Sequence, residues 1–281
     1  MVAAVVVLYN PDTNIVDNIS SYIDFVEKVY VVDNSNFSNE NLFQALPLKD
    51  KIEYVFNRGN LGIAKALNIG CQLAIQQGVK WLLTMDQDSK FLNLDRTIIR
   101  QISKIEGDRI ALYYPTYLIE GVVYDKYIEE NNSPIVVMTS GNFINLNVYR
   151  SIGGFEDKLF IDYVDIDYCL KIKAAGYSIA LLRDAILAHE LGNSKHLTFL
   201  SIKAIVTNHS SLRRYYITRN RMYVYKKHKT VSTVFSQTEK RIFINDILKI
   251  IFFEDDKILK FKSIIKGYLD YRNNKFGVYI K

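Results

Sequence analysis

The first 115 residues alternate between short apolar runs and segments with helical spacing, and this alternation constrains the fold more than any other feature. The apolar runs have the length of buried strands and lie at residues 3–9, 29–33, 52–56, 81–85 and 110–115. Two segments between them have the spacing of amphipathic helices, residues 14–26 and 63–77. Strands that alternate with helices form a mainly parallel sheet with helices on both faces, so we predict an α/β fold.

Polar side chains stand where several of these expected strands end. The run at residues 81–85 leads directly into Asp86, Gln87 and Asp88. The other runs end in or lead into a comparable set: Tyr9, Asn10, Asp33, Asn34 and Arg58. In open α/β sheets, ligands bind beyond the carboxyl ends of the strands, so these residues are candidates for ligand contacts. Asp86 and Asp88 would point to opposite faces of an extended segment, which leaves one of them to hold a metal ion; a solvated turn is the alternative.

The sequence contains no glycine-rich phosphate-binding loop of the dinucleotide or P-loop type. The segment NRGNLGIA at residues 57–64 instead places Gly59 and Gly62 just before a helix that is rich in small residues. Such a loop presents a helix N-terminus to an anion, although a tight turn before a closely packed helix is the simpler explanation. We therefore expect the phosphates of a nucleotide to be held through a divalent metal.

A second acidic cluster lies within residues 159–176, where Asp162, Asp165 and Asp167 precede a stretch with helical spacing. Helix capping accounts for one or two of these carboxylates but less readily for three, so one of them is a candidate general base. His189 ends a further apolar run at residues 185–189. Its position after an expected strand makes it a candidate metal ligand, and a structural role is the equal alternative.

The charge of the chain is divided unevenly. Residues 1–190 hold 17 Lys or Arg and 24 Asp or Glu, whereas residues 191–281 hold 19 and 6. An acidic body would repel a phosphate backbone, so we exclude nucleic acid as a partner. Apolar residues and lysines interleave along residues 241–268, which fits an amphipathic helix pair on an anionic membrane surface or a helical cap packed on the body.

No apolar run approaches the length that spans a bilayer, and residues 1–9 show no basic lead or cleavage site, so we expect a protein that is soluble or peripheral to a membrane. The two cysteines, Cys71 and Cys169, lie far apart in segments with helical periodicity. They are expected to be core thiols in a reducing compartment.

Taken in order, seven segments resemble the inverting family 2 glycosyltransferases of GT-A fold, in particular their bacterial rhamnosyltransferase-like branch. The matching pieces are VVVLYNP (residues 5–11), VVDNSN (31–36), NRGNLGIAKALNIG (57–70), MDQDS (85–89), SGNFINLNVYRSIGGFED (140–157), FIDYVDIDYCLKIKAAGY (160–177) and AHELG (188–192). The resemblance covers roughly residues 3–225. It implies a Rossmann-like nucleotide-binding sheet at residues 1–205, followed at 206–281 by a basic helical extension.

The resemblance also implies roles for single residues. Asp86 and Asp88 would bind the nucleotide sugar and a divalent ion, Mn²⁺ or Mg²⁺, with His189 joining the metal or diphosphate shell. Asp33 would bind the base and Asp165 would be the catalytic base. Further donor contacts would come from Tyr9, Asn10, Asn34, Arg58, Asn60, Gly62, Lys65 and Gln87. Acceptor or diphosphate contacts would come from Gly141, Asn142, Asp162 and, on a helix that closes over the diphosphate, Arg214, Tyr216, Arg219 and Asn220.

Two positions depart from the family pattern. Val164 precedes Asp165 where the family has a glutamate, and Lys171 stands where the family has an arginine. The missing glutamate bears on the acceptor contact more than on the base. Lysine keeps the charge of arginine but not its bidentate fork.

We accordingly predict a metal-dependent, inverting hexosyltransferase that moves L-rhamnose from dTDP-rhamnose to a lipid-linked saccharide during the synthesis of bacterial surface polysaccharide, such as O-antigen or capsule. The protein would be cytoplasmic and peripheral on the inner face of the plasma membrane, and an oligomer is compatible with the sequence. One alternative is a UDP-hexose or UDP-galactofuranose transferase of the same fold, and another is a non-catalytic membrane scaffold on a degenerate transferase fold. A nucleotidylyltransferase would need a glycine-rich, basic N-terminal loop, which residues 9–12 do not supply.

Overall fold

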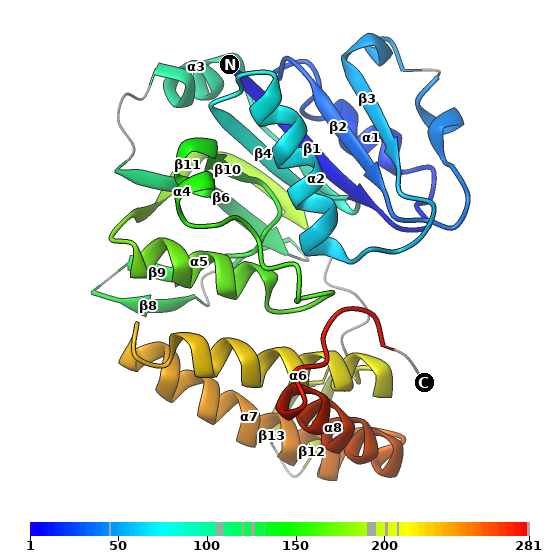
Figure 1. Cartoon of the computed structure of the whole chain (residues 1–281), viewed down its shortest axis with the longest axis vertical. Coiled ribbons are helices and arrows are strands. Elements are labelled where there is room, and N and C mark those ends of the chain that lie inside the picture. The colour runs from blue at the N-terminus through cyan, green and yellow to red at the C-terminus, as the bar shows by residue number, and fades with distance from the viewer. Residues whose placement is uncertain are drawn as a thin grey trace.

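The computed structural model describes residues 1–44, 46–104, 109–119, 121–124, 127–131, 133–189, 195–199, 202–206 and 208–279. A twisted central sheet with helices on both faces forms one part, and three helices form a second part beside it (Figure 1). The first part carries most of the buried apolar core.

The first half of the sheet is parallel, as the sequence predicts. Its strands run in the order β3-β2-β1-β4, with β1 at Val2–Leu8, β2 at Val29–Asp33, β3 at Ile52–Phe56 and β4 at Trp81–Asp86. Strands β1 and β2 are buried along their whole length, which is why they read as unbroken apolar runs rather than as alternating ones. The carboxyl ends of all four strands consequently meet at one edge.

The second half of the sheet is mixed, so the expectation of a mainly parallel sheet holds only up to β4. Strand β10 (Asn142–Asn145) runs antiparallel to both β4 and β6 (Ile110–Ile119). Strand β11 (Ser178–His189) is parallel to β6 and antiparallel to the short β5 (Ser89–Phe91). A four-residue strand buried on both faces carries no periodic signal, and strand direction follows from a chain path that spacing alone does not show.

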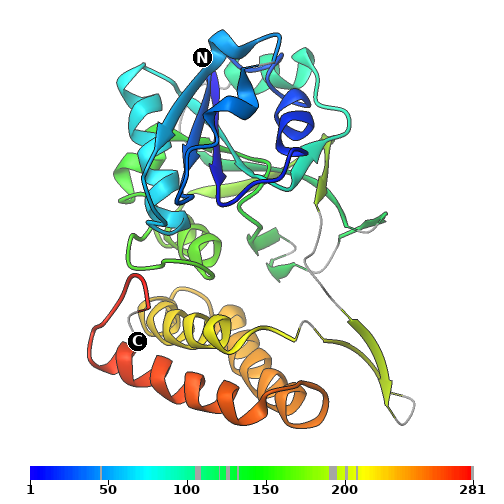
Figure 2. The ribbon, with the colours of Figure 1, turned by 90° about the vertical axis from the view of Figure 1, so that its right-hand side faces the viewer.

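Helices cover both faces of this sheet. In two perpendicular views α2 (Ile63–Gln76) and α1 (Ile15–Ser20) lie on opposite sides (Figures 1 and 2). The expected helix at residues 14–26 is shorter than predicted because the chain passes into turns after Ser20. The remaining elements of this part are α3 (Arg96–Lys104), α4 (Leu146–Ser151), α5 (Val164–Ala174), the 3-10 helices η1 (Glu40–Phe43) and η2 (Lys49–Lys51), and the strands β7 (Val122–Val123), β8 (Ile128–Glu130) and β9 (Ser133–Val136).

The small residues of α2 serve close packing on the sheet. A Cβ atom added to Gly70 would lie 2.2 Å from Cγ2 of Val5, a fully buried residue of β1. Ala64 and Ala66 are fully buried on the same helix. Helix α2 is therefore closely packed on the sheet, which is one of the two explanations that the sequence allowed for its small residues.

The C-terminal part consists of α6 (Ser211–His228), α7 (Thr233–Phe253) and α8 (Lys257–Arg272). The hairpin of β12 (Lys195–Phe199) and β13 (Ile202–Val206) precedes it and extends away from the sheet (Figure 2), and the expected domain boundary at residues 205 and 206 falls inside β13. None of the helices in the described ranges is long and apolar enough to cross a membrane.

Buried ion pairs join the three C-terminal helices. The guanidinium of Arg214 pairs with Glu254, and Lys260 lies 2.8 Å from the same carboxylate. Arg221 pairs with Asp246 at 2.7 Å. These helices therefore pack against one another.

Candidate functional site

Two aspartates and a histidine meet at the edge where β4 and β11 end. One ligand atom from each of Asp86, Asp88 and His189 lies within 4.8 Å of the others. Antiparallel pairing of β5 with β11 places Ser89 directly opposite His189, and the Ser89 hydroxyl shares a 2.7 Å hydrogen bond with Nδ1 of the ring. Such a contact fixes the orientation of a ligating histidine.

This group suits a hard divalent cation. Burial, together with the negative charges of Asp88 and Asp165, raises the pKa of Asp86 to about 7. A bound cation would relieve that accumulation of negative charge, and carboxylate and imidazole ligands suit Mn²⁺ or Mg²⁺. A cavity of about 490 Å³ opens beside the group and is lined by Gln87, Asp88 and His189 among others.

Asp33 lies buried at the end of β2 and is held as a carboxylate. Burial alone would favour its protonated form, but hydrogen bonds from Ser35, Tyr54 and Asn39 outweigh this and lower its pKa. The Ser35 N–H donates at 2.8 Å and the Asn39 side-chain amide at 2.9 Å. The residue is positioned at the strand end as predicted, and a contact with a nucleotide base stays a prediction.

The ends of β1 and β4 are tied together through Gln87. Its side-chain amide makes two hydrogen bonds with the backbone of Tyr9. The Tyr9 N–H donates to Oε1 at 2.8 Å, and Nε2 donates to the Tyr9 carbonyl at 3.3 Å. Asn10 takes a left-handed conformation with φ 46° and donates its N–H to the Ser35 hydroxyl at 2.7 Å. The side chains of Tyr9 and Asn10 are exposed, so they stand at the rim where a ligand would approach.

Asn34 organises the loop before α2. Its Oδ1 accepts from the Asn57 amide at 2.9 Å, and its Nδ2 donates to the Gly62 carbonyl at 3.3 Å. Asn60 Oδ1 accepts from the Gly62 N–H at 2.9 Å. A Cβ on Gly62, whose φ is 87°, would lie 2.7 Å from the Phe160 carbonyl oxygen, so glycine is required there. The two cations of this region, Arg58 and Lys65, are exposed.

The three aspartates of the second cluster have different surroundings. The carboxylate of Asp162 pairs with Arg213 at 3.0 Å. Asp167 is fully buried and pairs with cations of α5 and α6. Asp165, on the first turn of α5, pairs with no cation among the described residues. Burial is the main cause that raises the pKa of Asp165, to about 6, and the charge of Asp162 adds to it.

Several predicted contact residues have internal partners. Asn142 is buried, donating to the Met138 carbonyl at 2.6 Å and accepting from the Tyr117 hydroxyl at 3.0 Å. A Cβ on Gly141 would lie 2.8 Å from side-chain atoms of Leu187 and Pro115. Asn142 and Gly141 are therefore both packed within the sheet.

The α6 residues expected to reach a diphosphate are also turned inward. Arg214 is paired with Glu254, and Arg219 donates to the Gly277 carbonyl at 2.8 Å. Tyr216 stacks on Phe160 with ring centres 5.2 Å apart, and Asn220 donates to the Ile161 carbonyl at 2.7 Å. All four are buried, so in this structure they do not reach the Asp-Asp-His group. The sequence shows Arg214 but not its acidic partner Glu254, which follows 40 residues later.

Other site residues were not predicted. Ser89 orients His189, the Ser140 hydroxyl accepts from the Asp86 N–H at 3.1 Å, and Tyr54 donates to Asp33. The position of Ser89 directly after the Asp-Gln-Asp motif is a signal that could have found it. Ser140, in the turn before β10, and Tyr54, on β3, carry no comparable signal.

Solved structures with this fold define its class. The chain has a TM-score of 0.63 to S. aureus TarS 1-349 in complex with UDP-GlcNAc, at 14% identity, covering 96% of this chain and 80% of that one. It has a TM-score of 0.58 to GalNAc-T7 with UDP, GalNAc and Mn²⁺, also at 14% identity, over 80% of this chain and about half, 47%, of that one. The fold is therefore the GT-A fold of glycosyltransferases, as the sequence predicted.

Sequence comparison then places the chain within that class. It belongs to glycosyl transferase family 2, whose model matches residues 3–163. A dTDP-rhamnosyl transferase of Shigella flexneri, RfbF, is 30% identical over 241 residues, which cover 80% of this chain and 79% of the relative. The protein is thus a glycosyltransferase.

Proposed function

We propose that the protein transfers L-rhamnose from dTDP-rhamnose to a saccharide acceptor with inversion at the anomeric carbon. The observation that carries this proposal is the group of Asp86, Asp88 and His189 at the strand ends, close enough to Asp165 that the charge of Asp165 raises the pKa of Asp86. The similarity to RfbF favours rhamnose and a thymidine nucleotide.

The residues at the β4 edge fit a resident Mn²⁺ or Mg²⁺ held by Asp86, Asp88 and His189. When bound, such an ion supplies positive charge against the negative charge that builds on a leaving nucleoside diphosphate. Asp33, Tyr9 and the loop organised by Asn34 would contact the nucleoside. Arg58 and Lys65, which are exposed near that loop, would contribute cationic contacts to the donor.

Asp165 would act as general base. It is partly buried and has no cationic partner among the described residues, which keeps its carboxylate basic. With a pKa of about 6 the group is ionised at neutral pH and still able to accept a proton from an acceptor hydroxyl. Attack of that hydroxyl from the face opposite the diphosphate inverts the sugar in a single displacement.

The test is transfer to saccharide acceptors, with the product linkage read by NMR. We expect dTDP-L-rhamnose and Mn²⁺ to give a product of inverted configuration and Asp165→Asn to abolish transfer while donor affinity is kept. Transfer from UDP-galactofuranose or a UDP-hexose alone would replace the proposed donor. Retained configuration, or full activity of Asp165→Asn, would contradict the mechanism.

The acceptor is proposed to be lipid-linked, at an anionic membrane surface on the cytoplasmic side. Support comes from large apolar side chains that are exposed on the last two helices: Ile244, Leu248, Ile251 and Phe252 on α7, and Ile258, Leu259, Ile265 and Leu269 on α8. Lysines stand between them in the sequence, among them Lys249, Lys257 and Lys262. Apolar side chains bordered by lysines are the composition that binds anionic lipid interfaces.

Deletion of the C-terminal region would test this poorly, because α8 carries Lys260, the buried ion-pair partner of Glu254. Surface substitution is cleaner. Replacing Phe252 and Ile258 by serine, where Ile258 is 73% exposed, should reduce sedimentation with vesicles containing phosphatidylglycerol at low salt. Phe37→Ser, at a residue 84% exposed on the other part of the molecule, is the matched control and should leave binding unchanged. Equal binding of all three proteins would refute membrane docking by α7 and α8.

A further inference from the structure

The turn that leads into α5 has an unfavourable backbone conformation. Asp162 and Tyr163 are consecutive residues with φ values of 62° and 69°, both in the left-handed region. Residues other than glycine rarely adopt this region, and two such residues in succession need support from their surroundings. Asp165 follows two residues later, so the path of this turn fixes where its carboxylate lies.

Helix α6 supports the backbone of the turn. The side-chain amide of Asn220 donates to the Ile161 carbonyl at 2.7 Å and to the Asp162 carbonyl at 3.2 Å. Arg213, near the start of the same helix, pairs with the Asp162 carboxylate at 3.0 Å. The Asn220 side chain is fully buried.

Helix α7 supports the turn through Tyr163. Its hydroxyl donates to the Glu239 carboxylate at 2.8 Å and accepts from Nε of Arg221 at 2.6 Å. All three side chains are buried. The backbone of Tyr163 is in the left-handed region, and its hydroxyl is therefore held by one residue from α7 and one from α6.

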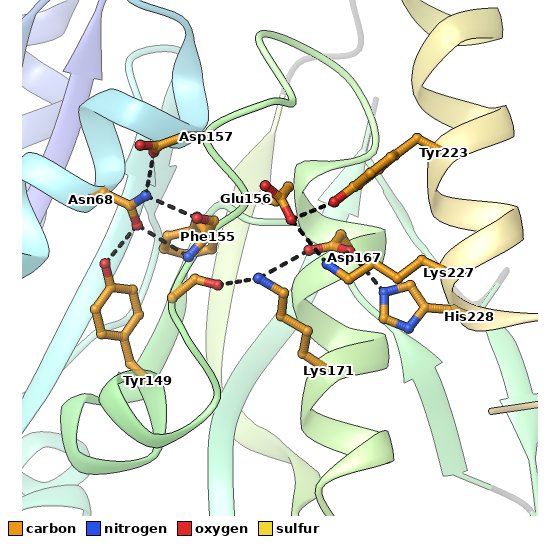
Figure 3. A network of polar contacts seen from close by, with 11 residues as sticks. Asn68, Tyr149, Phe155, Glu156, Asp157, Asp167, Lys171, Tyr223, Lys227 and His228 are labelled. Atoms are coloured by element: carbon orange, nitrogen blue, oxygen red, sulfur yellow. Dashed lines mark hydrogen bonds and ion pairs between the residues drawn. The ribbon is translucent and has the colours of Figure 1, made fainter. Parts of the chain in front are cut away.

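Further contacts hold the chain on either side of the turn. The Ile63 N–H donates to the Phe160 carbonyl at 2.8 Å, which joins the turn to the start of α2. Beyond the turn, the Asp167 carboxylate accepts from Lys227 and His228 of α6, each at 2.8 Å (Figure 3). The first turn of α5 is thus attached to the C-terminal helices both before and after Asp165.

We propose that α6 and α7 clamp the turn at Asp162 and Tyr163 in the left-handed conformation and thereby position Asp165 for proton transfer, with Asn220 and Tyr163 as positioning residues. This inference rests on the proposed function of Asp165. It gives the C-terminal region a part in catalysis that does not depend on contact with donor or membrane. The catalytic unit then comprises the sheet together with α6 and α7.

The test compares two substitutions of the same chemistry. Tyr163→Phe removes the hydroxyl that meets Glu239 and Arg221, whereas Tyr225→Phe removes an α6 hydroxyl that lies 3.2 Å from the Ser236 hydroxyl of α7 and does not touch the turn. We expect Tyr163→Phe to lower kcat about tenfold, since small misplacements of a reacting group are costly, with the donor dissociation constant within about twofold of wild type. Tyr225→Phe should match wild type in both. Asn220→Ala should reproduce the split between kcat and donor affinity.

Unchanged kcat in both Tyr163→Phe and Asn220→Ala would overturn the clamp while leaving the proposed function intact, as would an equal loss of kcat and donor affinity. Hydrogen–deuterium exchange of the peptide at residues 160–167 supplies a readout that does not depend on activity. Faster exchange of this peptide in Tyr163→Phe, with exchange of β1 and β4 unchanged, supports the clamp. This holds even if the wild-type protein transfers no sugar, in which case the proposed function fails and the clamp does not. Exchange equal to that of wild type and of Tyr225→Phe would overturn it.

Discussion

A general base with a pKa of about 6 should leave a measurable limb in the pH profile of transfer. Asp165 must be deprotonated to accept the acceptor proton, so kcat/KM rises as pH rises through 6. For a single group of this pKa, about nine-tenths is ionised at pH 7 and about one-tenth at pH 5, which predicts a fall of about tenfold between them. An unperturbed aspartate, with a pKa near 4, would leave the rate almost unchanged over that range.

The assay is the release of dTDP from dTDP-rhamnose at subsaturating donor, measured from pH 5 to pH 8 with saturating Mn²⁺ so that the carboxylate of Asp86 stays ionised. Asp165→Asn serves as control and, because it abolishes transfer, should release dTDP only at background level and without the limb. A profile that is flat from pH 5 to pH 7 in the wild-type protein, or a limb that persists in Asp165→Asn, would refute the assignment of Asp165 as base.

Three other substitutions test separate parts of the structure. Ser89→Ala should weaken Mn²⁺ binding about tenfold by calorimetry, because the hydroxyl that orients His189 is lost; unchanged affinity would show that the contact has no such role. Gly70→Ala should destabilise the protein by up to about 2 kcal/mol in urea unfolding, since overpacking against Val5 costs ~1–3 kcal/mol and the higher helix propensity of alanine offsets about 1 kcal/mol of this. Adding Val5→Ala should recover part of the overpacking, and a stabilised single variant would disprove the close packing. Asp167→Asn should cost about 3 kcal/mol at pH 7, because Lys227 and His228 lose their contacts with a buried carboxylate. The pKa of Asp167 is lowered in the fold, so its stabilisation is present above its unfolded pKa and is lost as pH falls through the folded value; a difference from wild type that does not shrink below about pH 4 would contradict this.

The strand ends were predictable because their residues follow directly from local sequence. Unbroken apolar runs mark β1, β2 and β4, and in a parallel sheet their carboxyl ends must meet, which brings Asp33 and Asp86 to one edge. The position of His189 at this edge depends on a long-range strand pairing instead. Its neighbour Ser89 belongs to β5, whose antiparallel pairing with β11 is a long-range contact that no spacing reveals.

The C-terminal helices show where prediction from sequence stopped. Arginine and tyrosine on residues 210–221 read as contacts to an anion, yet Arg214 and Arg221 are neutralised by Glu254, Glu239 and Asp246, which lie 18 to 40 residues further along the chain. Local sequence reports the type of charge but not its partner. The interleaved lysines and apolar residues likewise fitted both a cap and a membrane surface; in the structure Ile250 is buried, whereas Ile251, Ile258 and Ile265 are exposed.

The central claim is that the Asp-Asp-His group binds a metal-complexed nucleotide sugar. The most direct test is calorimetric titration of the protein with dTDP-rhamnose, UDP-galactofuranose, UDP-galactose and UDP-glucose, each with and without Mn²⁺, with Asp88→Ala as control. We predict that dTDP-rhamnose binds only when Mn²⁺ is present and that Asp88→Ala loses this binding. Binding that is independent of both Mn²⁺ and Asp88, or no binding of any donor, would contradict the claim.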